Sequence, residues 1–417
     1  MPVARPPRLV VLGVAVALTG MLSACSVVSP SSASDSPKSS GSSTSSTPAS
    51  PSSTTRPAAP AVSLTPSVTS DQSVPVDTVV KVAATGGTVT QVAMSYKDPK
   101  KGTTVAVEGT LDPAGASWTA NSLLEPGAAY ALAMTGKNAD GVTSTQSSTF
   151  TTQKLSLKEQ IYPTLVGDGA TVGVAMPVIV RFDVPVTDRK TIQQHLKVTS
   201  TPAQPGSWSW ISNNEVHFRP VAYWQPGTKV KVDVDINSVP AGNGVYGQIS
   251  ISGGFTVGRS LVMQADLATH QMNVLVNGEV ARTIPVTGGK SGFSTRSGTK
   301  VMMEKFSTLR MDANTVGIEP GDPNYYNIPD VRYAMRETNS GEFLHAAPWS
   351  VGSQGRANVS HGCIGMSTAN AGWLFNQVLV GDPVVVTGTS RTLEPGNGWT
   401  DWNIPFDQFK KGSALAS

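Results

Sequence analysis

The dominant pattern in this chain is a succession of short alternating apolar runs, each closed by a turn dipeptide. Between residues 62 and 152 the runs include 79–82, 89–92, 103–107 and 130–134, with Gly-Gly, Asp-Pro, Pro-Gly and Asp-Gly pairs between them. Turn signals at intervals of about 8 to 12 residues are typical of β-sandwich strands. Residues 153–258 repeat the pattern, for example at 178–182 and 229–234. The sequence therefore predicts two antiparallel β-sandwiches, over 62–152 and 153–258.

The composition supports this prediction and narrows the class of partner. Charged residues make up only 14% of the chain, and 40 Gly and 30 Pro interrupt it, which disfavours a helix-rich enzyme. Small sandwiches of immunoglobulin-like type fit such a composition better. The formal net charge is +3, from 31 basic and 28 acidic side chains, which is too small to indicate nucleic-acid binding. We therefore expect a mostly β protein with no nucleic-acid partner.

The first 24 residues have the layout of a secretory signal. Arg5 and Arg8 precede an apolar run at 9–18, which is too short to predict a transmembrane helix. The tetrad Leu-Ser-Ala-Cys at 22–25 resembles a bacterial lipobox, which implies cleavage before Cys25 and lipid modification of that residue. The protein would then be exported and anchored to the outer face of the cytoplasmic membrane, facing the cell wall. The alternative is a simple signal peptide with Cys25 incidental.

Residues 25–61 are mostly Ser, Thr and Pro, with few charges and few large apolar residues. Such a segment buries too little apolar area to offset the entropy of ordering its backbone. We interpret it as a disordered tether that sets the reach of the folded domains.

The two predicted sandwiches contain no catalytic pattern. We expect His195 and His217 to be exposed structural histidines, because neither has a partner motif in the sequence. The tryptophans of these domains are expected to fill the cores, and cell-wall binding is the alternative role for them. They are Trp118, Trp208, Trp210 and Trp224.

Residues 259–389 are predicted to form a third, β-rich domain with one main helix. Asn277-Gly278 between two alternating runs is a strong hairpin signal. A helical stretch runs from about Thr368 to Val380, with Ser367 as its cap. The tail at 390–417 carries Trp399, Trp402 and Phe406 and is expected to pack on this domain as an aromatic brace.

The sequence Ser360-His361-Gly362-Cys363 is the strongest chemical signal. A cysteine attacks as its thiolate and therefore requires a base, which histidine can supply. On an extended strand His361 and Cys363 point to the same side, and His345 lies far enough upstream for a return strand to bring it to the thiol. Ala346 has no side-chain acceptor, so we expect a backbone carbonyl to orient the His345 imidazole.

These residues, together with 345–350, Met311-Asp312 and 401–405, resemble the L,D-transpeptidases, the YkuD-type cysteine enzymes of bacterial cell walls, and in particular the mycobacterial members with immunoglobulin-like domains. The resemblance implies 3→3 cross-linking of peptidoglycan tetrapeptide stems, as donor and acceptor, with release of D-alanine and without a cofactor or metal. It also implies acylation by carbapenems.

The resemblance further implies a role for each matching residue. Cys363 would be the nucleophile, His345 the general base, and His361 a residue that helps to place the thiol. The amides of Gly362 and Cys363 would form an oxyanion hole with the hydroxyl of Tyr326, although its neighbour Tyr325 is an alternative. The donor pocket would be lined by Met311, Trp349 and Ser360, while core packing is the alternative for Met311 and Trp349.

One position departs from the family pattern, which usually has Asn or Arg two residues after the cysteine. Gly365 stands there instead. We expect a looser site and slower acylation, so Gly365→Asn should raise the acylation rate. The substitution would lower the rate instead if the glycine has a positive φ that Asn tolerates poorly, or if it admits a bulkier donor.

Three other functions compete with transpeptidation. His345, His361 and Cys363 could serve as ligands of a catalytic zinc centre. A wall-binding lipoprotein with a weakened catalytic domain is the second, and a hydrolase of the same fold, which transfers the acyl group to water, is the third.

Overall fold

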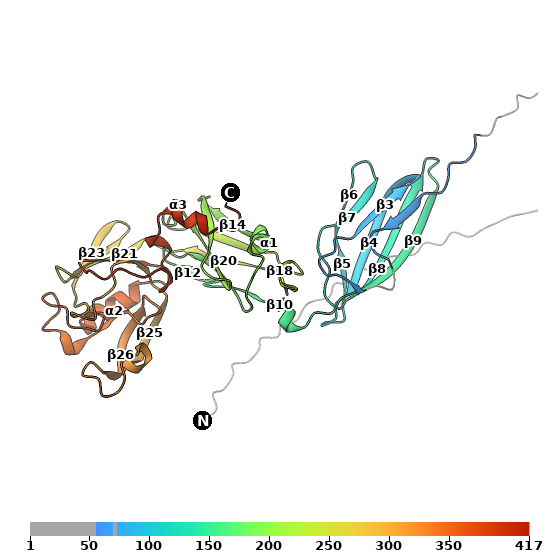
Figure 1. Ribbon diagram of the computed structural model, residues 1–417. Coiled ribbons are helices and arrows are strands. Elements are labelled where there is room, and N and C mark those ends of the chain that lie inside the picture. The colour runs from blue at the N-terminus through green and yellow to red at the C-terminus, as the bar shows by residue number, and fades with distance from the viewer. Residues whose placement is uncertain (1–55, 70–72, 417) are drawn as a thin grey trace, which may run out of the picture. The chain divides into compact units, whose positions relative to one another are not determined.

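The computed structural model describes residues 56–69 and 73–416. The expected signal peptide, most of the tether and Cys25 lie outside the described residues. Contacts divide the chain into Met1–Pro57 and Ala58–Ser417, and the description below concerns the second unit. This unit is mostly β, as predicted, with two sandwiches followed by a β-rich domain with one main helix (Figure 1).

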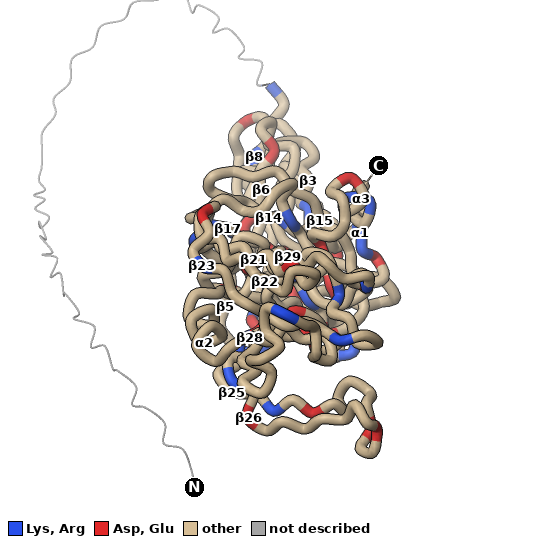
Figure 2. The backbone as a smooth tube through the Cα atoms, turned by 90° about the vertical axis from the view of Figure 1, so that its left-hand side faces the viewer, with Lys and Arg blue, Asp and Glu red and all other residues tan. Residues whose placement is uncertain are grey.

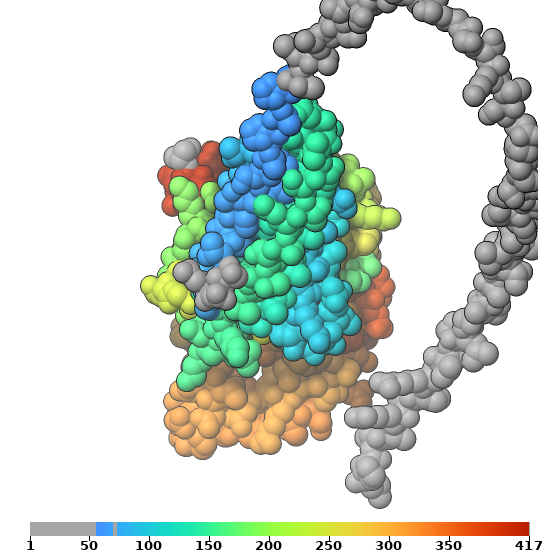
Figure 3. Space-filling model, turned by 90° about the vertical axis from the view of Figure 1, so that its right-hand side faces the viewer, coloured from blue at the N-terminus to red at the C-terminus, as the bar shows by residue number. Residues whose placement is uncertain are grey.

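The first sandwich is built from a four-stranded and a five-stranded sheet. The strand order of the four-stranded sheet is β1 (Ser63–Pro66), β3 (Lys81–Thr85), β7 (Ser117–Ala120) and β6 (Gly109–Leu111). The strand order of the five-stranded sheet is β2 (Ser73–Val74), β9 (Thr143–Thr152), β8 (Ala129–Asn138), β4 (Gly87–Lys97) and β5 (Thr104–Val107). Trp118 is buried between the sheets, as predicted, and Tyr130 stacks on Phe150 at 4.9 Å. Figure 3 shows the residues at the start of this sandwich (blue) beside the residues near its end (green).

The second sandwich has two four-stranded sheets and a short third one. Their strands are β11 (Pro163–Leu165), β13 (Val178–Phe182), β16 (Glu215–Pro220) and β15 (Gly206–Trp210); β12 (Thr171–Val172), β20 (Ile251–Val257), β17 (Lys229–Val234) and β14 (Leu196–Thr201); and β10 (Gln160–Ile161), β19 (Val245–Gly247) and β18 (Pro240–Gly242). Helix α1 (Arg189–Gln194) joins β13 to β14. Trp208, Trp210 and Trp224 are all buried in this core, which confirms that prediction.

The prediction that His217 is exposed is wrong. Only 2% of His217 is exposed, and it lies between two carboxylates. Its Nδ1 is 2.9 Å from Asp401 and its Nε2 is 2.8 Å from Glu215. Burial alone would lower the pKa of His217, but the two carboxylates together raise it to about 9. The partner Asp401 lies 184 residues away in sequence, where no local pattern could reveal it. His195, by contrast, is partly exposed at the end of α1.

The third domain packs two sheets and a helix around one core. The first sheet has the order β23 (Glu279–Pro285), β22 (Gln271–Val276), β21 (Leu261–Asp266), β29 (Pro383–Thr387) and β24 (Gly298–Val301), and the second has β25 (Glu304–Asp312), β26 (Asn327–Arg336), β27 (Phe343–Ala346) and β28 (Ile364–Met366). Asn277 and Gly278 both have positive φ and close the predicted hairpin between β22 and β23.

The main helix, α2 (Thr368–Gln377), follows β28 directly. Ser367 caps it by accepting a hydrogen bond from the Asn370 amide, as predicted. The helix ends at Gln377 because Val378 is extended. Its buried residues Ala371 and Leu374 belong to the same core as Leu344 of β27 and Ile364 of β28, so the helix supports the two strands on which the site is built.

The aromatic tail was expected to pack on the catalytic domain. It instead contacts both the catalytic domain and the second sandwich and joins the two. Trp399 belongs to the core of the second sandwich, and Trp402 donates a hydrogen bond of 2.7 Å to the Ala175 carbonyl. Helix α3 (Phe406–Phe409) follows, and the Arg219 guanidinium lies 4.7 Å from the ring of Phe409. Asn403 accepts a hydrogen bond from the Thr299 amide on β24 and thereby attaches the tail to the catalytic domain. Tryptophan rings require a large apolar surface, and the second sandwich provides it.

Candidate active site

The predicted site residues meet in one cavity of the third domain. Its volume is about 310 Å³ and its lining is largely apolar. The second sheet positions these side chains, since Met311 lies on β25 and His345 on β27, while the others lie in segments that adjoin its strands. Seven of the eight site residues predicted in this domain line the cavity, all except Gly362: Met311, Tyr326, His345, Trp349, Ser360, His361 and Cys363.

Cys363 lies immediately before β28 and is not in a disulfide. It is 9% exposed, and its Sγ lies 3.7 Å from the carbonyl oxygen of Gly341. Burial raises the pKa of the Cys363 thiol to about 12, and the negative charges of Glu342 and Glu337 add to this effect. The resting residue is therefore a thiol at neutral pH.

His345 lies on β27 opposite Gly365 of β28. The imidazole is 5% exposed, and its Nδ1 is 2.8 Å from the carbonyl oxygen of Ala346. A carbonyl only accepts hydrogen bonds, so Nδ1 carries the proton and Nε2 keeps a free lone pair. This confirms the prediction that a backbone carbonyl orients the ring. Burial lowers the pKa of His345, so the base is neutral and ready to accept a proton.

His361 forms an aromatic wall of the cavity. Its ring lies 4.8 Å from the ring of Phe293 and 5.1 Å from that of Tyr326, and both contacts are tilted or edge-on. Burial lowers the pKa of His361, and the charge of Lys290 lowers it further. The Nε2 of His361 is buried without a hydrogen-bond partner among the described residues. Its effect on the position of the thiol stays a prediction.

Ser360 braces the loop that carries the nucleophile. Its hydroxyl donates to the Cys363 carbonyl at 2.6 Å and accepts from the Gly362 amide at 3.1 Å. In this conformation the Gly362 N–H has the Ser360 hydroxyl as its acceptor, and the expected role of this amide in an oxyanion hole stays a prediction. The Cys363 amide, in contrast, donates to no acceptor in the described part of the chain.

The two candidate tyrosines, Tyr325 and Tyr326, differ in their surroundings. Tyr326 lines the cavity, and burial followed by the charge of Cys363 raises the pKa of its hydroxyl to about 12. The phenol therefore stays protonated and can donate a hydrogen bond. The Tyr325 hydroxyl instead donates to Asp312 at 3.2 Å.

Met311 and Trp349 differ in burial although both line the cavity. Met311 is 9% exposed and packs in one cluster with Cys363 and Phe343, so it serves both the core and the pocket wall. Trp349 is 55% exposed and stacks on the His345 ring at 5.8 Å, which excludes the core-packing alternative for this residue. Its exposed face forms the rim of the cavity.

The looser site expected at Gly365 is not found. The backbone of Gly365 is held on both sides, by β27 and by an antiparallel bridge to Thr287. A Cβ at Gly365 would lie 2.9 Å from the Ala347 Cβ and 3.1 Å from the Thr287 Cγ2. The space of a larger side chain is thus already filled by neighbours, and glycine is the residue that fits.

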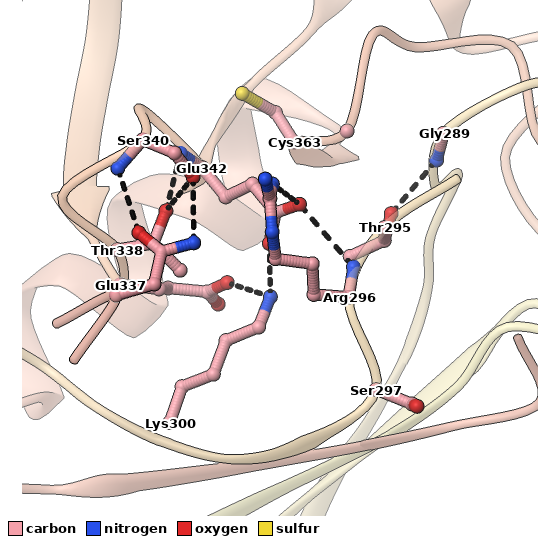
Figure 4. A network of polar contacts seen from close by, with 12 residues as sticks. Gly289, Thr295, Arg296, Ser297, Lys300, Glu337, Thr338, Ser340, Glu342 and Cys363 are labelled. Carbon is pink, nitrogen blue, oxygen red and sulfur yellow. Dashed lines mark hydrogen bonds and ion pairs between the residues drawn. The ribbon is translucent and has the colours of Figure 1, made fainter. Parts of the chain in front are cut away.

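A buried ionic cluster behind Cys363 was not predicted from the sequence (Figure 4). Lys300 on β24 is fully buried and binds Glu337 and Glu342, at 2.9 and 2.7 Å. Arg296 binds the other oxygen of Glu342 at 2.9 Å. The only sequence signal was Lys300 itself, which directly precedes the apolar run 301–303, since lysine is rare in a buried strand.

The described residues contain no group of three or more His, Cys, Asp or Glu side chains arranged to hold a metal ion. Within the same part of the chain, no helix has the length and apolarity needed to cross a membrane. Lys and Arg are interspersed with Asp and Glu along the backbone (Figure 2).

Comparison with known proteins agrees with this site. The YkuD family profile, the L,D-transpeptidase catalytic domain, matches residues 261–386, and a bacterial Ig domain profile matches residues 71–240. L,D-transpeptidase 2 of Mycobacterium tuberculosis is 37% identical over 355 residues, which are 85% of this chain and 85% of that protein.

Solved structures of similar proteins include an L,D-transpeptidase, LdtMt1, in complex with imipenem, which is 38% identical, with 55% of this chain and 99% of that chain covered and a TM-score of 0.48. L,D-transpeptidase 3 of Mycobacterium tuberculosis in complex with a faropenem-derived adduct is 30% identical, with 56% and 100% covered and a TM-score of 0.46. Because the identity with L,D-transpeptidase 2 extends over most of both chains, this chain belongs to the L,D-transpeptidase family and is an enzyme of that type.

Proposed function

We propose that this enzyme forms 3→3 cross-links between peptidoglycan tetrapeptide stems through an acyl-enzyme on Cys363. The observation that carries the proposal is the pairing, in one cavity, of a protonated thiol with a neutral histidine whose Nε2 is free. Such a pair is suited to transfer a proton at the moment of attack.

In the first half-reaction the carbonyl carbon of the third donor residue is attacked by the Cys363 sulfur. His345 Nε2 takes the thiol proton as the S–C bond forms, and then gives it to the nitrogen of the departing D-alanine as the C–N bond breaks. The oxyanion is stabilised by the unoccupied Cys363 amide and by the protonated Tyr326 hydroxyl.

In the second half-reaction the side-chain amine of an acceptor stem attacks the thioester. His345 takes the proton of the amine and returns it to the sulfur, so the enzyme regains its starting state. Trp349, exposed beside His345, is placed to cover the acyl group or the incoming stem. Transfer to water is the second candidate reaction, and the product separates the two.

The same chemistry predicts covalent inhibition by carbapenems. Ring opening by Cys363 forms a stable acyl-enzyme, and a related structure is described as a complex with imipenem and another as containing a faropenem-derived adduct. We also propose export and lipid attachment at Cys25, which rest on the sequence at 22–25. Mass spectrometry of the mature protein from membranes tests the attachment.

The experiment for the main proposal is intact-protein mass spectrometry after mixing with a disaccharide-tetrapeptide. An adduct on Cys363, a cross-linked dimer and free D-alanine are expected, and all three are lost in Cys363→Ala. Free tripeptide without dimer would identify a hydrolase instead. An adduct on another residue of Cys363→Ala would contradict the proposal.

A further inference from the structure

The ionic cluster behind Cys363 takes no part in the reaction proposed above, yet it lies against the nucleophile. The carboxylate of Glu342 is its centre: Oε2 accepts from Lys300 Nζ at 2.7 Å, and Oε1 accepts from Arg296 Nη1 at 2.9 Å and from the Arg296 amide at 3.2 Å (Figure 4). Glu342 and Lys300 are 3% and 1% exposed. The carboxylate is therefore fixed by three donors in a site closed to water.

Glu342 contacts the catalytic loop at two points. Its own peptide follows Gly341, whose carbonyl oxygen lies 3.7 Å from the Cys363 sulfur. Its Oε1 lies 3.3 Å from the place where a Cβ on Gly362 would be, so the carboxylate packs against the Gly362 backbone. Gly362 has a φ of +121°, a conformation that favours glycine. The Glu342 side chain thus lies beside the Gly362 peptide, while the carbonyl of the residue before Glu342 lies beside the sulfur.

Such a cluster is not the most stable way to fill this space. Buried ion pairs lose the solvation of both ions, and apolar residues of similar volume often stabilise a fold as well or better. A cluster of this kind is better explained by what it does to the site than by stability.

The groups around the sulfur include the backbone amide of Phe343, which favours the thiolate, and side chains in front of the sulfur and behind it. His345 and Tyr326 line the cavity in front of it. Glu342, Glu337 and Lys300 act on it from behind, where the two carboxylates disfavour a thiolate and the lysine favours it, with Glu342 as the largest of the three. Beyond them, Arg296 joins Glu342 to the half-exposed Glu394.

We propose that Glu342 is a positioning residue for acyl transfer, which fixes the Gly362 peptide and places a negative charge behind the Cys363 sulfur. The inference rests on the proposed function of Cys363 and His345. A thiol kept neutral in this way reacts poorly with alkylating agents and oxidants, which require the thiolate. It reacts well only with an acyl donor that is bound next to the base.

The test compares Glu342→Gln with the wild type by two measurements on the full chain. The first is the rate of Cys363 alkylation by iodoacetamide between pH 7 and 9, and the second is the acylation rate with imipenem, both by intact mass. Removing the negative charge is expected to lower the pKa of the thiol, which gives faster alkylation at each pH. Imipenem acylation is expected to slow, because Gly362 is no longer fixed.

Two further variants make the result unambiguous. Glu304→Gln removes an exposed partner of Arg336 in the same domain and should leave both rates unchanged. Glu342→Asp keeps the negative charge but places it farther from Gly362, because its side chain is shorter. Alkylation should therefore stay slow, while the acylation rate should lie between those of Glu342→Gln and the wild type. A merely structural role would change folding without this separation of the two rates.

If Glu342→Gln does not fold, the triple variant Lys300→Met/Glu337→Gln/Glu342→Gln replaces it, because Lys300 also binds Glu337 and removing all three charges leaves no unpaired ion among them. Its alkylation should still be faster than that of the wild type, since Glu342 affects the sulfur more than Lys300 does. An unchanged alkylation rate in a folded variant overturns the inference. A wild type that imipenem does not acylate contradicts the proposed function instead, whatever the alkylation rates are.

Discussion

Gly365 and Thr287 exchange both of their backbone hydrogen bonds, each 2.9 Å long, across the floor of the active-site cavity. This bridge leaves no room for a side chain at Gly365, because its Cβ would approach Ala347 to 2.9 Å. We expect Gly365→Asn to slow acylation by imipenem by about tenfold or more, since shifts near 1 Å in a reacting geometry have large effects. Stopped-flow fluorescence measures the rate of acylation by imipenem.

A matched control is available for this substitution. Gly352 lies in the loop after Trp349, and nothing lies within 4 Å of a Cβ placed there. Gly352→Asn should therefore acylate at the wild-type rate. Faster acylation in Gly365→Asn would restore the hypothesis of a loose site.

The two adjacent tyrosines offer an internal comparison. Tyr326→Phe removes the only hydroxyl proposed to face the oxyanion, so acylation should slow by on the order of a hundredfold, with little change in donor affinity. Tyr325→Phe removes a hydroxyl that binds Asp312 at 3.2 Å and should change the rate less than about twofold. Equal losses in both variants would show that the loop, and not the hydroxyl, matters.

The pH dependence of acylation tests the neutral thiol and imidazole. The pKa of His345 is lowered by burial and that of Cys363 is raised to about 12, so both groups keep their reactive forms between pH 7 and 9. The acylation rate should be flat across this range and should fall only as pH drops through the lowered pKa of His345. A rate that rises about tenfold per pH unit from 7 to 9 would indicate attack by a free thiolate.

Because of His217, the free energy of unfolding should depend on pH in the alkaline range. Its pKa is raised from 6.5 to about 9 in the folded protein, so its contribution is full below about pH 6.5 and is lost as pH rises through about 9. At about 1.4 kcal/mol per pKa unit, the contribution is on the order of 3 kcal/mol. Thermal unfolding should show a fall in Tm between pH 7 and 10 that His217→Gln lacks. An identical fall in the variant would assign the effect to other groups.

The sequence allowed the fold class and the hairpin at Asn277-Gly278 to be predicted, because each is encoded over a short span. Alternation gives strands, and Asn-Gly gives the turn. The carbonyl that orients His345 was also predictable, since Ala346 has no other acceptor to offer.

What could not be predicted depends on contacts between residues far apart in the chain. The partner of His217 is Asp401, and Lys300 meets Glu337 and Glu342 only after two sheets have packed together. The acceptor for the Gly362 amide is the hydroxyl of Ser360, two residues before it, and depends on a loop geometry that a strand pattern does not describe. The environment of Gly365 is likewise set by Thr287, from another part of the fold.

The tail has a consequence for how this protein can be dissected. The rings of Trp399, Trp402 and Phe409 pack against the second sandwich. Asp401 pairs with His217 of the same sandwich. A shortened chain that begins at residue 259 would present these rings to water and invite aggregation. We therefore expect the smallest stable enzyme to begin before β10, because the second sandwich and the catalytic domain share the tail and should fold as one unit.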